Sequence, residues 1–250
     1  MLTPERHAII LQILKEKGTV KIQELVERTQ SSESTIRRDL TQLEEDHFLK
    51  RIHGGASLLQ GKLIEPSMVE KSTKNLHQKQ KIAQYAASIV EDGDCIYLDA
   101  GSTTKEMIPY LNQNDLVVVT NGLEHIAPLL EKGIRTYLIG GYAKNRTNAT
   151  IGRGALVSLG QYRFDKCFLG VNGIHSELAF TTPDQEEAMV KKKATTLSNK
   201  NYVLADETKF GEISFAKIMD LNKADIITTQ LDQEILSLFK GKTTIKVVSE

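Results

Sequence analysis

Composition alone says little about this chain. Its 250 residues include two cysteines and no tryptophan, and its 32 Lys and Arg residues balance 32 Asp and Glu residues. Cys95 and Cys167 have no nearby Cys or His at metal-ligand spacing, so we expect buried reduced thiols, no disulfide, no metal and no cofactor. Because the net charge is zero, only the placement of charges can indicate a nucleic-acid partner.

Long apolar runs are also missing. Glu5, Arg6 and His7 interrupt the first turn, and no stretch approaches the length of a membrane span. We therefore expect a cytoplasmic protein. With 40% hydrophobic and 26% charged residues, the chain has the composition of an ordinary globular protein of one or two domains.

The first 57 residues have the periodicity of a winged helix-turn-helix domain. Thr3 and Pro4 open a first helix, predicted from Pro4 to Glu16, and Gly18 ends it. A second and a third helix follow, separated by a serine-rich turn over residues 31–34 that supplies an N-cap. The apolar positions recur at helical spacing, at Ile10, Ile13, Leu14, Ile22, Leu25, Val26, Ile36, Leu40 and Leu43.

The third helix has a short polar face. With its apolar positions buried, Ser34 and Arg38 point away from the core, while Thr35 and Arg37 lie on the flanks. A basic segment then runs into Gly54 and Gly55, which predicts a hairpin wing. Such a helix enters the major groove by its N-terminal half, and such a wing follows the phosphate backbone. The predicted DNA contacts are Ser32, Ser34, Thr35, Arg37, Arg38, Lys50, Arg51 and His53.

Another interpretation of this helix is purely structural, because Arg38 beside Asp39 also fits an exposed ion pair.

Residues 58–74 lose clear periodicity and are predicted to be a linker to a larger domain at residues 75–250. Apolar strand-like runs alternate there with helical segments, which predicts an α/β fold with a largely parallel sheet. Small, polar or acidic residues follow most of the strands. Because ligands bind outside the carboxyl ends of parallel strands, these residues predict an effector pocket. The predicted strands are Cys95–Leu98, Leu116–Val119, Thr136–Ile139, Lys166–Leu169, Tyr202–Ala205 and Asp225–Thr228.

The segment from Leu98 to Thr104 leaves a strand and enters a helix predicted from Lys105 to Leu111. Its glycine permits a tight turn, and the amides and hydroxyls of Ser102, Thr103 and Thr104 can hold a phosphate at the helix N-terminus. A plain turn with a Ser or Thr N-cap explains this segment equally well.

Two later clusters carry polar groups that can contact a sugar phosphate. Asn172 and Asp184 can bond sugar hydroxyls, and Lys209 can supply a positive charge at a strand end. The alternatives are a β-turn with a proline-started helix for the first cluster and a solvated lysine for the second. The segment from Lys144 to Ala155, which contains Arg153, is either a phosphate clamp or a solvated loop.

The motifs Thr3–Arg6, Ser34–Leu40 and Arg51–Gly55 resemble those of the DeoR family of bacterial sugar-metabolism repressors, and the similarity continues through the whole chain. The resemblance implies a sensor domain of the ribose-phosphate-isomerase-like fold, with a sugar phosphate bound at the Asp99–Thr104 turn and at Lys209. Residues 147–152, 165–173 and 181–184 are most similar to fructose-operon repressors. Fructose 1-phosphate is then the implied effector, with tagatose 6-phosphate and fructose 1,6-bisphosphate as alternatives.

The family resemblance favours a regulator, and a sugar-phosphate isomerase is the alternative. Isomerisation needs a base, and the neutral amide of Asn172 cannot accept a proton, which leaves Glu186 or Glu187. We expect no catalysis, and a homo-oligomer whose paired heads match paired half-sites of double-stranded operator DNA. The predicted effector contacts are Asp99, Gly101, Ser102, Thr103, Thr104, Thr120, Asn121, Gly140, Gly141, Arg153, Gly170, Asn172, Gly173, Asp184, Asp206 and Lys209.

Overall fold

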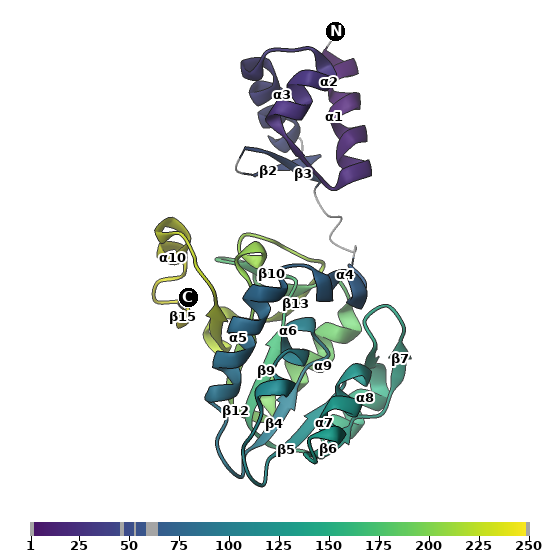
Figure 1. Cartoon of the computed structure of the whole chain (residues 1–250), viewed down its shortest axis with the longest axis vertical. Coiled ribbons are helices and arrows are strands. Elements are labelled where there is room, and N and C mark those ends of the chain that lie inside the picture. Colours follow the sequence, from purple (N-terminus) through teal and green to yellow (C-terminus); the bar gives the residue numbers. More distant parts are fainter. Residues whose placement is uncertain (1–2, 46–47, 53, 59–64, 249–250) are drawn as a thin grey trace. The chain divides into compact units, whose positions relative to one another are not determined.

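The chain divides into two compact units, Met1–Gly61 and Lys62–Glu250, in a computed structural model (Figure 1). The structure describes residues 3–45, 48–52, 54–58 and 65–248. Each unit has its own apolar core, so each is described by itself.

The first unit packs helices against a small antiparallel sheet with the strand order β1-β3-β2. Its core contains the apolar residues predicted from the helical periodicity, among them Ile10, Leu25 and Leu40. The predicted winged helix-turn-helix is therefore confirmed. Its elements are α1 (Thr3–Lys17), β1 (Thr19–Lys21), α2 (Ile22–Thr29), α3 (Glu33–Glu45), β2 (Leu49–Ile52) and β3 (Gly55–Leu58).

The two glycines of the wing are required by the backbone. Gly54 has a φ of +76°, which favours glycine over residues with a side chain. A Cβ atom on Gly55 would lie 2.1 Å from the carbonyl oxygen of Val20, so β3 can approach β1 only without a side chain there.

A buried ion pair joins the first and third helices. The guanidinium of Arg6 donates to both carboxylate oxygens of Asp39, at 2.5 Å and 2.8 Å, and His7 lies 3.3 Å from the same carboxylate. Asp39 is therefore the partner of Arg6 in the core, and the exposed pair considered for Arg38 is not formed.

The second unit is built on a parallel sheet with the strand order β15-β14-β12-β9-β4-β5-β6 (Figure 1). This confirms the predicted α/β architecture. The chain moves outward from β4 through β5 to β6, and then returns to the other side of β4 with β9. The strands are β4 (Cys95–Leu98), β5 (Val117–Thr120), β6 (Arg135–Leu138), β9 (Phe164–Gly170), β12 (Ser198–Leu204), β14 (Asp225–Thr228) and β15 (Ile245–Val247).

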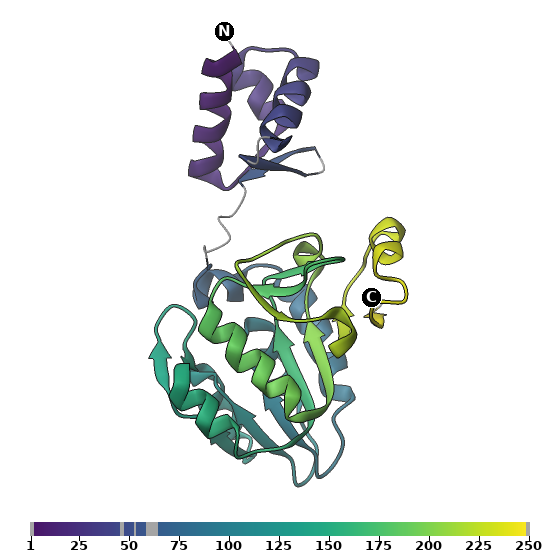
Figure 2. The same cartoon turned by 180° about the vertical axis from the view of Figure 1, so that it is seen from behind.

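Helices cover both faces of this sheet, as Figures 1 and 2 show from opposite sides. One apolar cluster joins the sheet to α5 (Leu76–Ser88) and α7 (Ile126–Glu131), and the other joins it to α8 (Gly152–Leu159) and α9 (Gln185–Thr196). Helix α10 (Gln233–Phe239) contributes Phe239 to the second cluster.

Smaller antiparallel pairings, which the sequence reasoning missed, flank the parallel sheet. The strands β10 (Gly173–His175), β11 (Ala179–Thr182) and β13 (Ala216–Met219) form one sheet. The strands β7 (Tyr142–Lys144) and β8 (Ala149–Ile151) form a hairpin. The segment from Lys144 to Ala155 is therefore the end of this hairpin and the start of α8, not a loop throughout.

Two further predictions differ from the structure. Residues 65–74 of the predicted linker belong to the second unit, where Met68 is buried at the start of α4 (Met68–Thr73). The helix predicted from Lys105 to Leu111 is replaced by α6 (Ser102–Lys105) and a 3₁₀ turn at Ile108–Tyr110. Pro109 explains this break, because a proline ring clashes with the carbonyl four residues earlier, here that of Lys105.

Across the described ranges, no helix is both long and apolar enough to cross a membrane.

Asp39→Ala is expected to destabilise the first unit by roughly 3 kcal/mol, because the buried guanidinium of Arg6 loses the carboxylate that balances its charge. Glu33→Ala is the control, since it removes only the exposed pair between Arg37 and Glu33 and should cost less than about 1 kcal/mol. Chemical unfolding followed by amide NMR signals of the first unit measures both values. Equal losses in the two variants would contradict a structural role for the buried pair.

Candidate functional sites

The predicted DNA contacts on helix α3 differ in their exposure and in the hydrogen bonds they make within the protein. Ser34, Arg37 and Arg38 are exposed, and Thr35 is half-buried. Among the residues that the structure describes, the side chain of Arg38 makes no hydrogen bond or ion pair, whereas Arg37 donates to Glu33 at 2.6 Å and 2.9 Å. Arg38 is therefore the arginine whose guanidinium can bind a base edge without first breaking a contact.

Ser32 is the N-cap that the serine-rich turn predicted. Its hydroxyl oxygen accepts from the backbone N–H of Thr35 at 3.2 Å and lies 2.8 Å from the Thr35 hydroxyl. It also lies 2.9 Å from the hydroxyl of Ser34. These contacts fix the first turn of α3, so Ser32 orients the exposed face.

The wing is attached to the same helix. Arg51 donates from its guanidinium to the Thr41 hydroxyl, and from its backbone N–H to the Glu44 carboxylate, both at 2.8 Å. Lys50, on β2, also has an interaction partner. His53 lies outside the described residues.

The strand order reverses between β4 and β9, and this is where a ligand crevice is expected in an open parallel sheet. Asp99 follows β4, and one of its carboxylate oxygens accepts from the N–H of Gly170 at 3.1 Å. The same oxygen forms an ion pair with Lys191 of α9. Lys191 also donates to the carbonyl of Gly170 at 3.1 Å. Both charged side chains are buried, and sequence reasoning missed Lys191.

The predicted phosphate turn lies directly after Asp99. The hydroxyl of Thr104 donates to the carbonyls of Asp99 and Gly101, at 2.5 Å and 2.8 Å, and accepts from the N–H of Gly101. Thr104 therefore stabilises the turn. The hydroxyls of Ser102 and Thr103 make no hydrogen bond within the described chain, so they remain available to a ligand at the start of α6.

Thr120 and Asn121 support this turn from β5. Thr120 donates to the carbonyl of Leu98 at 2.7 Å, and the amide oxygen of Asn121 accepts from the N–H of Ala100 at 2.8 Å. Both side chains are fully or almost fully buried and bonded within the protein. Both residues therefore support the turn, and their predicted contact with effector stays a prediction.

His125 is a buried neighbour that the sequence did not indicate. Its Nδ1 lies 2.8 Å from the hydroxyl of Thr120, and its ring is fully buried. Burial lowers the pKa of this imidazole to about 4, although the nearby charge of Asp99 acts in the opposite direction. The ring therefore stays neutral near pH 7.

Three predicted contacts around β10 and α9 are also used within the fold. The amide oxygen of Asn172 accepts from the Thr182 hydroxyl at 3.1 Å. A Cβ atom on Gly173 would lie 2.4 Å from the carbonyl oxygen of Glu212. Asp184 is the N-cap of α9 and accepts from two backbone N–H groups. All three therefore have structural roles in the fold, and their predicted contact with effector stays a prediction.

The candidate bases of the isomerase alternative differ in their surroundings. The carboxylate of Glu187 accepts from Lys144 at 2.9 Å and from the Thr147 hydroxyl at 2.7 Å. Glu186 is exposed on the first turn of α9. The contacts of Glu187 are those of a structural carboxylate.

Gly140, Gly141 and Arg153 lie away from the point where the strand order reverses. The two glycines follow β6, the edge strand, which β5 separates from β4. Gly141 has a φ of +138°, and a Cβ atom there would lie 2.5 Å from the carbonyl oxygen of Ile151. Arg153 is exposed on α8. The structure therefore does not bring these three together with Asp99.

The carboxyl end of β12 also carries predicted effector contacts. Asp206 is buried and caps a 3₁₀ turn at Glu207–Lys209, accepting from the N–H of Thr208 at 3.0 Å. Lys209, at the end of this turn, makes no side-chain hydrogen bond or ion pair within the described chain. Burial lowers its pKa, and the charges of Lys74 and Lys71 add to this effect.

Lys79 of α5 joins this group of lysines. Burial lowers its pKa to about 8, and the charges of Lys209 and Lys74 act in the same direction, against Asp206 and Glu106. Its ammonium donates to the carbonyls of Lys71 and Lys74. The side-chain nitrogen of Asn75, next to Lys74, is buried and has no hydrogen-bond acceptor among the described residues. We infer a locally positive region that an anion would stabilise.

A buried charge network holds the start of the second unit. Lys144 forms ion pairs with Glu65, Asp184 and Glu187, at 2.5 Å, 2.8 Å and 2.9 Å. Burial alone would lower the pKa of Lys144, but these carboxylates raise it. Arg146 adds a contact to the carbonyl of Glu65. Lys144 therefore connects Glu65, which lies within the predicted linker, to the N-terminus of α9.

Comparisons with known proteins agree with this architecture. Residues 6–62 match the DeoR-like helix-turn-helix domain, and residues 74–230 match the DeoR C terminal sensor domain. The chain belongs to the DeoR family. This confirms the resemblance seen in the motifs, and it makes the protein a helix-turn-helix transcriptional regulator.

Individual relatives are similar over almost the full length. The chain is 55% identical over 249 residues to a Bacillus subtilis protein named "Uncharacterized HTH-type transcriptional regulator FruR", with 99% of each chain covered. It is 36% identical over 236 residues to a lactose phosphotransferase system repressor of Staphylococcus aureus, covering 92% of this chain and 93% of that protein. Among solved structures, ribose 5-phosphate isomerase A of Methanocaldococcus jannaschii covers 55% of each chain, with 21% identity and a TM-score of 0.41.

The neutral His125 predicts a pH dependence of the second unit. Its folded pKa of about 4 lies below the ordinary value of 6.5, so the unfolded chain binds the proton more readily. Stability is then complete above pH 6.5 and falls as the pH decreases toward 4, by roughly 3 kcal/mol in total. His125→Asn should flatten this slope, measured by chemical unfolding at several pH values. His77→Asn, at an exposed position, is the control, and an unchanged slope in His125→Asn would refute the assignment.

Proposed function

We propose that this regulator represses a sugar-utilisation operon, and that a phosphorylated sugar controls its binding to operator DNA. The observation that carries the effector half of the proposal is the group of lysines beside the turn of Ser102 and Thr103. Lys79 and Lys209 both have lowered pKa values, mainly because burial disfavours their charged forms; the charges of neighbouring lysines add to this, against those of Asp206 and other carboxylates. A phosphate would supply the missing negative charge while the free hydroxyls donate hydrogen bonds to it.

Fructose 1-phosphate is our preferred effector. The support comes from the 55% identity to a protein named FruR and from the motifs that resemble fructose-operon repressors. Tagatose 6-phosphate and fructose 1,6-bisphosphate are the next compounds to test. A thermal-shift panel of these sugar phosphates ranks them directly.

For the DNA half, we propose that α3 inserts its N-terminal end into the major groove while the wing lies on the phosphate backbone. Arg38 reads a base, because its guanidinium is exposed and makes no contact within the described chain. Arg51 binds phosphate and exchanges its bond to Thr41 for a charge-assisted one. One such head makes few phosphate contacts, so we propose a homo-oligomer that pairs heads on paired half-sites.

We further propose that α9 carries the signal from effector to linker. Its Lys191 is bonded to Asp99 beside the phosphate turn, and its Asp184 and Glu187 are bonded to Lys144. Lys144 also holds Glu65, which directly follows residues 59–64. A shift of α9 on effector binding would therefore change how the start of this unit is held. Such coupling requires that the effector bind one arrangement more tightly than the other.

Lys209→Met should weaken fructose 1-phosphate binding about tenfold or more, since it removes a cation from the proposed phosphate site. Isothermal titration calorimetry on the full chain measures this. Lys240→Met, which removes an exposed lysine at the end of α10, is the matched control and should leave the affinity unchanged. Equal affinities for the two variants would remove Lys209 from the site. An operator affinity that does not change at saturating effector would refute the coupling.

Arg38→Ala should cost about 1 to 3 kcal/mol of operator binding and little on random duplex, because a base contact is lost. Arg51→Ala should weaken both duplexes and reduce the salt dependence, because a phosphate contact is lost. Fluorescence anisotropy with operator and random DNA at several salt concentrations separates these effects. If Arg38→Ala weakens both duplexes equally, Arg38 is a phosphate contact.

A further inference from the structure

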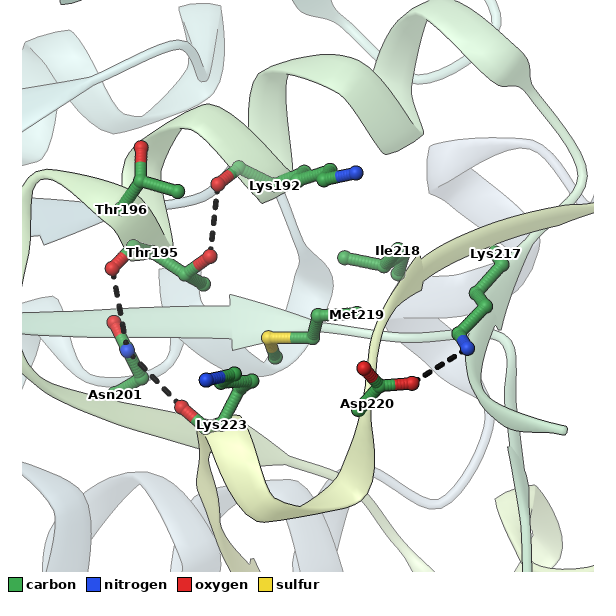
Figure 3. Close-up of a pocket in the computed structure, with 9 residues that line it drawn as sticks. All are labelled: Lys192, Thr195, Thr196, Asn201, Lys217, Ile218, Met219, Asp220 and Lys223. Carbon is green, nitrogen blue, oxygen red and sulfur yellow. Dashed lines mark hydrogen bonds and ion pairs between the residues drawn. The ribbon is translucent and has the colours of Figure 1, made fainter. Parts of the chain in front are cut away.

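A separate cavity of about 500 Å³ lies beside the last turns of α9 (Figure 3). Its other walls come from β13, from β12 at Asn201, and from the 3₁₀ turn at Leu221–Lys223 with the residue before it. None of the residues predicted to bind DNA or effector lines it. Its volume falls in the range of small-molecule sites, which runs from roughly 300 to 1,000 Å³.

Hydrogen bonds fix the walls of this cavity. The side-chain nitrogen of Asn201 donates to the carbonyl of Thr195, at the end of α9, and to the carbonyl of Lys223, at 3.3 Å and 3.0 Å. These bonds hold the end of the helix and the 3₁₀ turn at a set separation (Figure 3). Ile218 and Met219 contribute apolar surface and are almost completely buried, with 1% and 6% exposure. The cavity is therefore preformed, with an apolar part and a polar rim.

The rim carries an excess of positive charge. Lys192, Lys217 and Lys223 come from three different elements, and Asp220 is the one carboxylate among the lining residues that the structure describes. Asp220 forms an ion pair with Lys217 at 2.5 Å. The side chains of Lys192 and Lys223 form no ion pair or hydrogen bond within the described ranges, and they lie on either side of Met219 in Figure 3.

These lysines also affect the pKa of Asp220. The bond and charge of Lys217 lower the pKa of this carboxyl, and the charges of Lys223 and Lys192 lower it further. The negative end of the α9 dipole accounts for one lysine near the helix end. It does not account for Lys217 and Lys223, which come from elements outside that helix. Like charges brought together on separate elements are stabilised when an anion lies between them.

We propose that this cavity is a second anion-binding site, which takes a small phosphate monoester. Lys192 and Lys223 bind its phosphate, and Ile218 and Met219 contact its carbon skeleton. The site is distinct from the proposed effector site, because the two share no lining residue. Lys191 is bonded to Asp99, whereas the next residue, Lys192, lies about 100° further round α9 and lines the cavity.

The test uses the full chain with ¹³C-methyl methionine, because Met219 lies in the cavity while Met107 is buried elsewhere. Inorganic phosphate and glycerol 3-phosphate are titrated at constant ionic strength, with chloride as the reference anion. We expect a saturable shift of the Met219 signal and an unmoved Met107 signal. No shift, or an equal shift with chloride, would overturn the proposal.

Variants separate this site from the effector site. The double variant Lys192→Ala with Lys223→Ala should weaken the phosphate affinity, measured from the shift of the Met219 signal, at least tenfold. The variant Lys240→Ala should leave this affinity unchanged. The single variant Lys223→Gln replaces the pair if the double variant is unfolded, as judged from Met107. Lys209→Met should also leave the response unchanged, and its loss there would mean a signal transmitted from the effector site. If a glutamate-rich peptide displaces phosphate and binds more tightly, the occupant is a protein segment and the proposal fails.

Discussion

The ion pair between Asp99 and Lys191 sets the arrangement at the carboxyl edge of the sheet. Both groups are buried, and removing either would leave an uncompensated charge. The pair is satisfied only if β4, β9 and α9 keep their positions, because the same two groups also bond the N–H and carbonyl of Gly170. Burial alone would lower the pKa of Lys191, and the charge of Asp99 raises it instead. The adjacent turn is therefore built on a rigid base.

The polar residues near this ion pair, at the carboxyl edge of the sheet, are of two kinds. Thr104, Thr120 and Asn121 use their side chains to support the turn, whereas Ser102 and Thr103 keep free hydroxyls. Lys79 and Lys209 lie on neighbouring segments, and burial lowers the pKa of both, with nearby lysine charges adding to the effect. The backbone of such a site is rigid at the turn, and lysine side chains supply positive charge where a ligand would bind.

The sequence was sufficient for those features that depend on local patterns. The helix periodicity placed the first unit's core, and runs such as Cys95–Leu98 located strands to within a few residues. It was insufficient for Lys191, which stands in a run of three lysines that reads as a solvated surface. Its partner Asp99 is 92 residues away, so only the folded sheet brings the two together. Lys79 and Lys144 were missed for the same reason, because burial and charge partners are not visible in a linear pattern.

The helix predicted from Lys105 to Leu111 was wrong for a local reason: Pro109 is incompatible with a regular α-helical turn before it, and apolar periodicity alone does not reveal that break. Gly140 and Gly141 show the limit of an argument from strand ends. They do follow a strand, but β6 lies at the sheet edge, and strand order was not readable from the chain.

The contacts made by helix α9 limit how the length of the chain can change. Asp184, Glu187 and Lys191 use one side of this helix, and Lys192 lies about 100° further round it. One inserted or deleted residue between Asp184 and Lys191 would rotate everything after it by about 100° around the helix axis. The contact with Asp99 and the wall of the cavity would then be lost in a single step. A substitution in α9 alters the contacts of one residue, whereas an insertion or deletion alters the contacts of every residue after it.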